Sequence, residues 1–252
     1  MSDALVTDAL ITGALINKNG VADTLVTNNL VTDDPVPPSL RMRREPRQKR
    51  SRAVVRQIEQ ATLTLLAEQG FSALNTNAIA ERAGVGIKSL YHLFPNKEAI
   101  IYRLAAQWLT AVRVAEQEIL AKELAWPEML TAVDHALDEL DERFAGYGPL
   151  WRAMDLIPAL QALEEAHERE QIRFWSERLR HFGCRWPEPD LVALVTYFYR
   201  TADVAKQCAK EHGDSGRQLW RMHRLWLEQL LGTAISEPEP KQVMRRLASP
   251  SR

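Results

Sequence analysis

The chain has 252 residues, and its 32 Lys and Arg residues nearly balance 33 Asp and Glu residues, which gives a net charge of −1. It contains no glycine-rich phosphate-binding loop and no nucleophile elbow, which argues against the common nucleotide-dependent and hydrolase classes. Its two cysteines, Cys184 and Cys208, stand far apart, so we expect no disulfide framework, no zinc site and a reduced, cytoplasmic setting.

Residues 1–40 repeat with a period of five, and the same phase holds Leu5, Leu10, Leu15, Leu25 and Leu30. The copies are too few to wind a stable solenoid, and Asp or Asn in nearly every repeat excludes a signal peptide or a membrane span. We predict a flexible or weakly ordered extension. The stretch DDPVPPSL reads as a linker that keeps it off the globular part, so a chain beginning at Met42 should lose nothing of the domain.

Charge is unevenly distributed along the chain. Residues 1–40 have a net charge of −4, residues 41–105 of +7 and residues 106–252 of −4. Most of the positive surplus lies in RMRREPRQKRSR, which we predict to be a basic arm over residues 41–51. Arg47, Lys49 and Arg50 are its candidates for contact with DNA phosphates or the minor groove, although such a run can also be a simple solvated arm.

The segment TNAIAERAGVGIKSLYHLFPNKE (residues 76–98) spells two short helices joined by a glycine turn. Ile79, Ala80 and Ala83 form a small apolar face on the first helix, and Gly84 ends it by taking a left-handed conformation. Leu90, Leu93 and Phe94 form the inner face of the second helix. Its outer and flanking faces are left with Ile87, Lys88, Ser89, Tyr91 and His92. This pattern is typical of a helix-turn-helix that binds DNA, the alternative being an ordinary helical hairpin with a solvated face.

Over residues 52–105 the sequence resembles the DNA-binding domain of the tetracycline-repressor (TetR) family of bacterial transcription regulators. In RAVVRQIEQATLTLLAEQGFSALNT the first helix would place Ile58, Ala61, Leu65 and Ala67 in the core, end at Gly70, pack Phe71 back and let Asn75 cap the second helix. In SLYHLFPNKEAI, Pro95 would stop the recognition helix and Lys97 would open a long fourth helix. The family commonly has Ser and then Gly where this chain has Gly86 and Lys88.

The resemblance implies a DNA-binding surface made of side chains from the arm and from both short helices. Ile87, Lys88 and Ser89 would face base edges, whereas Thr76, Asn77, Tyr91, His92 and Lys97 would hold phosphates. The full set of candidate DNA-binding residues is Arg47, Lys49, Arg50, Thr76, Asn77, Gly86, Ile87, Lys88, Ser89, Tyr91, His92 and Lys97.

From about residue 97 onward Pro and Gly marks divide an otherwise helical pattern into helices over residues 97–122, 127–145, 149–157, 158–182, 188–212 and 215–235. The fold class is therefore all-α: a three-helix helix-turn-helix domain (52–105), a helical ligand-binding and dimerisation domain (106–236) and a polar tail (237–252). Members of the family dimerise through their last two long helices. Here these helices carry apolar stripes, namely Leu191, Leu194, Val195, Phe198, Ala202 and Ala205, then Leu219, Met222, Leu225, Trp226 and Leu230.

All seven tryptophans lie in the second domain, where each is either a core residue or part of a ligand pocket. The family's ligand contacts vary too much for transfer between members. We take as candidate ligand-binding residues Trp108, Trp151, Met154, Trp175, Tyr197 and Arg200.

Two other classes remain as alternatives. Glu164 and His167 form one Glu-x-x-His motif of the kind used in di-iron bundles, but the sequence has no second copy, and we read His167 as a surface histidine. The second alternative is an architectural DNA-binding protein that responds to no effector. The sequence favours a non-enzymatic regulator without a cofactor, a repressor that binds a palindromic DNA operator as a homodimer, responds to an unidentified small molecule and has no membrane segment.

Overall fold

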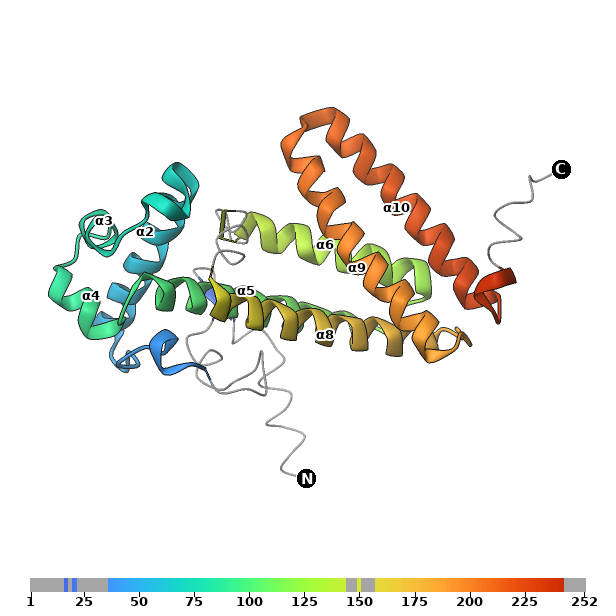
Figure 1. Cartoon of the computed structure of the whole chain (residues 1–252), viewed down its shortest axis with the longest axis horizontal. Helices are drawn as coiled ribbons and strands as arrows, with labels where there is room; N and C mark the ends of the chain where they lie inside the picture. The colour runs from blue at the N-terminus through green and yellow to red at the C-terminus, as the bar shows by residue number, and fades with distance from the viewer. Residues whose placement is uncertain (1–15, 18–19, 22–35, 144–148, 151–156, 243–252) are drawn as a thin grey trace, which may run out of the picture. The chain divides into compact units, whose positions relative to one another are not determined.

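The computed structural model describes residues 16–17, 20–21, 36–143, 149–150 and 157–242 (Figure 1). The chain divides into two compact units. Unit 1 comprises Met1–Glu123 and Ala132–Ala166, and unit 2 comprises Leu124–Thr131 and His167–Arg252. The all-α class is confirmed. The helices are α2 (Lys49–Ala73), α3 (Thr76–Arg82), α4 (Ile87–Leu93), α5 (Lys97–Leu120), α6 (Trp126–Arg143), α8 (Pro158–His181), α9 (Glu188–Glu211) and α10 (Gly213–Ser236).

The predicted helix limits agree with these bounds to within about two residues, the usual uncertainty of helix ends. Most of the helix expected at residues 149–157 lies outside the described residues. The domain limits at residues 105 and 236 stay predictions. Among the helices in the described ranges, none combines the length and the apolar character needed to cross a membrane.

Helices α2 to α5 form the N-terminal part of unit 1 around fully buried side chains that include Ile58, Ile79, Leu90 and Phe94. As expected, the Asn75 side chain caps α3 by accepting a hydrogen bond from the backbone N–H of Ala78 at 3.0 Å. Gly84 follows α3 with a φ of 66°, the left-handed turn that the sequence predicted.

The first helix departs from the expected pattern at two positions. Ala67 is exposed and not in the core, because it lies two residues after the buried Leu65 and therefore on nearly the opposite side of a helix. Gly70 has a φ of 73° and interrupts α2, but the chain resumes helical structure as far as Ala73.

Residues 36–45, which we call the N-terminal strap, are not the detached linker and arm that the sequence suggested. A short 3₁₀ helix, η1 (Pro38–Leu40), packs against α5 and buries Leu40 in the core of unit 1. The Asn96 side chain donates a hydrogen bond to the Ser39 carbonyl at 3.0 Å while its oxygen caps α5 at the Ala99 N–H. The expectation that a chain beginning at Met42 loses nothing is therefore wrong, since it would lose this packed turn.

Within the period-five segment the described residues form a minimal antiparallel pair. Strand β1 (Ile16–Asn17) pairs with β2 (Gly20–Val21), with Ile16 opposite Val21 and Asn17 opposite Gly20. The rest of the predicted flexible extension lies outside the described residues.

Unit 2 is organised around the antiparallel α9–α10 pair. The two helices approach so closely at Gly216 that an added Cβ there would lie 2.7 Å from the carbonyl oxygens of Cys208 and Ala209. His167, expected on the surface, is only 8% exposed and packs edge-on against Tyr199. Helix α9, which carries Tyr199, covers His167 on α8. The i, i+4 pattern of α8 alone does not reveal this contact with another helix.

Candidate DNA-binding surface

Helix α4 presents a buried inner face and an exposed outer face, as the apolar spacing predicted. Leu90 and Leu93 are buried, whereas Lys88, Ser89, Tyr91 and His92 are exposed. Ile87 differs from the expectation of an outward side chain: it is half-buried and packs against the core of unit 1. It shares the helical row of Leu90, three residues later, so part of its surface is covered.

Side chains fix α3 to both neighbouring helices. The Thr76 and Tyr91 hydroxyls are hydrogen-bonded at 2.9 Å, which joins the start of α3 to the end of α4. At the other end of α3 the Arg82 guanidinium donates two hydrogen bonds to the Glu68 carboxylate on α2, at 2.7 and 2.9 Å. This pairing lowers the pKa of Glu68. Asn77 is exposed beside Thr76.

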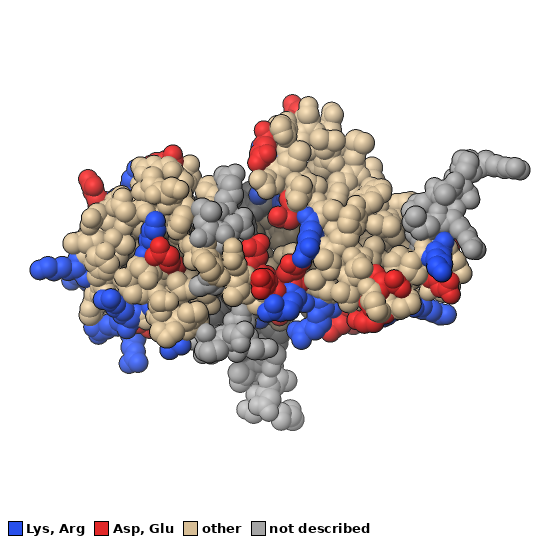
Figure 2. Space-filling model, viewed as in Figure 1, with Lys and Arg blue, Asp and Glu red and all other residues tan. Residues whose placement is uncertain are grey.

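A group of cations surrounds the start of α2. Lys49 and Arg50, predicted to belong to an extended arm, form the first turn of α2, and no acidic residue lies in that turn. Cations at a helix N-terminus oppose the helix dipole at a cost of about 0.3–1 kcal/mol each, which a bound phosphate would offset. Arg47 is exposed just before this turn. Figure 2 shows Lys and Arg gathered on the surface over α4 and the start of α2.

The strap contacts the C-terminal end of α4, an interaction that the sequence did not suggest. The Arg43 backbone N–H donates to the Leu93 carbonyl at 2.8 Å, and Arg43 Nη1 donates to the Tyr91 carbonyl at 3.1 Å. Arg44 Nη1 lies 3.3 Å from His92 Nε2. The two side-chain contacts join residues 48 apart in the sequence, and two of the three acceptors are backbone carbonyls, so no local motif could have indicated the contact.

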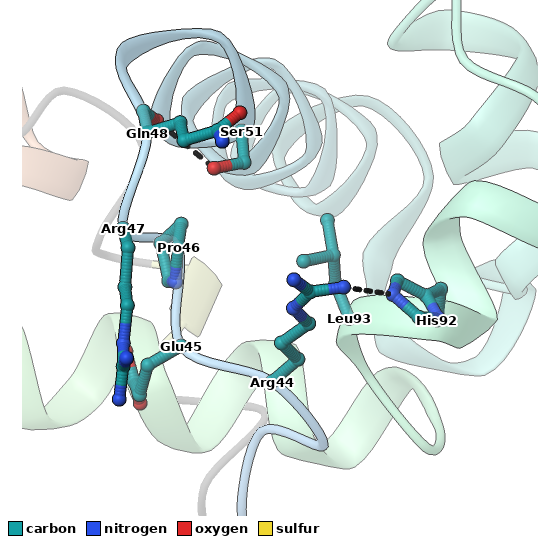
Figure 3. Close-up of a pocket in the computed structure, with 8 residues that line it drawn as sticks. All are labelled: Arg44, Glu45, Pro46, Arg47, Gln48, Ser51, His92 and Leu93. Carbon is teal, nitrogen blue, oxygen red and sulfur yellow. Dashed lines mark hydrogen bonds between the residues drawn. The ribbon is translucent and has the colours of Figure 1, made fainter.

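The same region contains a pocket of about 510 Å³ between the strap, the start of α2 and the end of α4 (Figure 3). Its walls are Arg44, Glu45, Pro46, Arg47, Gln48, Ser51, His92 and Leu93. The lining supplies two guanidinium groups, a hydroxyl and an imidazole, the side-chain chemistry that holds phosphate oxygens, and Glu45 adds one carboxylate.

The sequence suggested that Lys97 faces outward to a phosphate, but its side chain has partners within unit 1. Its ammonium donates to the Leu74 carbonyl at 2.8 Å and lies 4.2 Å from the centre of the Phe71 ring. The chain turns sharply after Gly70, so these groups meet the first residue of α5. We therefore leave Lys97 out of the proposed phosphate contacts.

The described candidate ligand-binding residues are divided between the two units. Trp108 is buried in the core of unit 1, and Trp175 is buried in unit 2 at 5.0 Å, ring centre to ring centre, from Phe198. Tyr197 is exposed on α9, and the exposed Arg200 pairs with Glu168 at 2.7 Å. Trp151 and Met154 lie outside the described residues. The effector site thus stays a prediction, and packing accounts for the two described tryptophans.

An exposed apolar face lies on the α9–α10 pair. Leu219, Met222 and Leu225 are between 52% and 69% exposed, while Leu227 and Leu231 on the other side of α10 are buried. Trp226 contacts Tyr197 edge-on, and His223 lies stacked on Trp220 and tilted against Trp226. Burial, aided by the charge of Arg224, lowers the pKa of His223, which favours the neutral ring among these aromatic groups at pH 7.

Residues 58–104 match the sequence model of the family described as "Bacterial regulatory proteins, tetR family". Among solved structures, the chain is similar to the crystal structure of a TetR-family transcriptional regulator from Streptomyces coelicolor. The identity is 25%, the match covers 73% of this chain and 98% of that one, and the TM-score is 0.48. The comparison with curated proteins yields no match.

The matched segment contains α3, the glycine turn and α4, the elements that form a DNA-binding helix-turn-helix. The protein is a DNA-binding regulator and not an enzyme. By this segment, residues 58–104, the chain carries the DNA-binding domain of the TetR family of transcriptional regulators.

Proposed function

We propose that this protein is a cytoplasmic, ligand-responsive repressor that binds a palindromic operator as a homodimer. The observation that carries the proposal is the two-faced α4 helix, whose inner residues are buried while Lys88, Ser89, Tyr91 and His92 are exposed next to a cationic surface. In the proposed complex α4 enters the major groove, where Lys88 and Ser89 contact base edges and the exposed edge of Ile87 contacts thymine methyl groups.

Phosphate contacts would hold α4 in register. The candidates are Arg47, Lys49 and Arg50 around the start of α2, with Thr76, Asn77, Tyr91 and His92 on α3 and α4. Gly86 leaves the first backbone N–H groups of α4 without a side-chain cap, so they are free to approach a phosphate closely.

The exposed apolar face of α10 supports the homodimer. Monomeric proteins rarely expose several large apolar side chains side by side, and two such faces packed together would form a four-helix bundle. Two α4 helices would then read half-sites one helical turn of DNA apart, about 34–36 Å.

Ligand control requires that movement of α5 reach the DNA-binding helices. Within unit 1 the Glu59 carboxylate on α2 accepts hydrogen bonds from Arg103 at 2.7 Å and Gln107 at 2.9 Å on α5, and all three side chains are buried. Such a buried charged network resists separation, so a ligand that tilts α5 would carry α2 and the DNA-binding helices with it. The change in spacing would release one half-site.

The test is Lys88→Ala measured against a panel of single-base operator variants, with the operator first found by genomic footprinting. We expect a loss of about 1–3 kcal/mol on the best operator and relaxed preference at one position in each half-site. Lys122→Ala, which removes an equal charge from the turn after α5, is the control and should leave the preference profile intact. If the wild-type protein binds all sequences alike, the ligand-independent architectural alternative holds instead.

A further inference from the structure

We propose that the N-terminal strap sets the position of α4 on DNA, with Arg43 as the positioning residue. The inference rests on the proposed reading of DNA by α4, and it assigns to residues 36–45 a role in sequence discrimination beyond their positive charge.

The first observation is the double contact of Arg43 with the end of α4. The last carbonyls of a helix have no partners within the helix, and Arg43 satisfies those of Leu93 and Tyr91 with its backbone N–H and its guanidinium. A cation at this end also favours the helix dipole. Since α4 has only seven residues, this contact involves a large part of the element.

The second observation is that the strap is anchored on both sides of Arg43. Before it, Leu40 is buried in the core and the Ser39 carbonyl accepts a hydrogen bond from Asn96. After it, the Glu45 carboxylate lies 3.9 Å from Arg103 Nη1, the guanidinium that also binds Glu59. Arg43 therefore links the end of α4 to the junction of α2 and α5 and does not move as a free arm.

The consequence concerns the geometry of base contacts. Lys88 and Ser89 lie on the turns of α4 that precede its Arg43-bound end, so a small rotation of that end displaces them from base edges. Loss of the Arg43 contact should lower specific binding more than non-specific binding, because backbone contacts tolerate such a shift and base contacts do not.

The test compares Arg43→Ala, Arg43→Lys and Arg41→Ala in the full chain. Arg41→Ala is the matched control, since it removes an equal charge from the strap, and the Arg41 guanidinium donates to the Val36 carbonyl within the strap. We expect Arg43→Ala to reduce the ratio of operator affinity to random-DNA affinity about tenfold, the effect of losing one charge-assisted hydrogen bond. Arg43→Lys should recover part of the ratio by donating to the Tyr91 carbonyl, and Arg41→Ala should leave it unchanged.

Amide hydrogen exchange without DNA separates this inference from the proposed function. Residues 90–94 should exchange several-fold faster in Arg43→Ala than in Arg41→Ala or the wild-type protein. Equal exchange, or an equal loss of specific and non-specific affinity in both Ala variants, would overturn the positioning role. If residues 90–94 exchange faster in Arg43→Ala but the wild-type protein binds all DNA sequences alike, the proposed operator binding is overturned and the positioning role of Arg43 is not.

Discussion

The ammonium of Lys97 is directed into the protein although its position in the sequence suggests a phosphate contact. It opens α5, and both its hydrogen bond to the Leu74 carbonyl and its place over the Phe71 ring hold the end of α2 against α5. The last carbonyl groups of a helix lack partners within the helix, and a side-chain donor such as the Lys97 ammonium satisfies them.

We expect Lys97→Met, which keeps most of the apolar stem, to lower the free energy of unfolding by about 1–2 kcal/mol. Urea denaturation would measure it, with the exposed Lys88→Met as a control that changes stability by less than about 0.5 kcal/mol. A salt titration of DNA binding supplies the counter-test. If Lys97 held a phosphate, the slope of log K against log salt would become shallower by about 0.9 per contact in Lys97→Met.

The two glycines of the turn, Gly84 and Gly86, should respond in opposite directions to substitution. Gly84 has a φ of 66°, so Gly84→Ala should cost about 1 kcal/mol. Gly86 is the N-cap of α4 in an extended conformation with room for a Cβ. Gly86→Ser should therefore raise the free energy of unfolding by about 0.5 kcal/mol, through a new cap and a less flexible unfolded chain. Urea midpoints would show both effects, and a shift of both in one direction would contradict this account of the turn.

The close approach of α9 and α10 beside their connecting turn depends on Gly216. An Ala Cβ would meet two backbone carbonyls at 2.7 Å, and backbone cannot move aside as a side chain can. We expect Gly216→Ala to lower the free energy of unfolding by about 1–3 kcal/mol. The control is Gly232→Ala on the same helix, where the atom nearest to an added Cβ is Trp126 Nε1 at 3.8 Å. The higher helix propensity of Ala should raise the free energy of unfolding of this variant by as much as about 1 kcal/mol. Equal thermal shifts in the two variants would rule out the close approach.

The exposed apolar face of α10 should determine the oligomeric state of the protein. Leu225 is 69% exposed in the single chain, so Leu225→Glu should be harmless to folding but should place an unpaired charge in a dimer interface. We expect sedimentation to show a folded monomer with weakened operator binding. Arg185→Glu, at an exposed site in the same unit, should remain dimeric. A dimeric Leu225→Glu protein would mean that the interface lies elsewhere.

The helices and the inner face of α4 can be predicted from the amino-acid sequence, because they follow from short-range periodicity, glycine turns and caps. Asn75 caps α3, Gly84 turns left-handed, and Leu90, Leu93 and Phe94 are buried as their spacing predicted. The family also followed from this local pattern, since the residues that carry it lie within one continuous segment.

The partners of the cationic side chains could not be predicted from the sequence and are visible in the folded chain. Arg43 and Lys97 both donate to backbone carbonyls, and these carbonyls carry no residue-specific signal in the sequence. The sequence predicts Leu40 to lie in a linker and His167 on the surface, yet partners distant in the sequence bury both side chains. Periodicity reports which face of a helix is apolar, whereas the choice among solvent, DNA and another part of the chain depends on contacts between segments far apart.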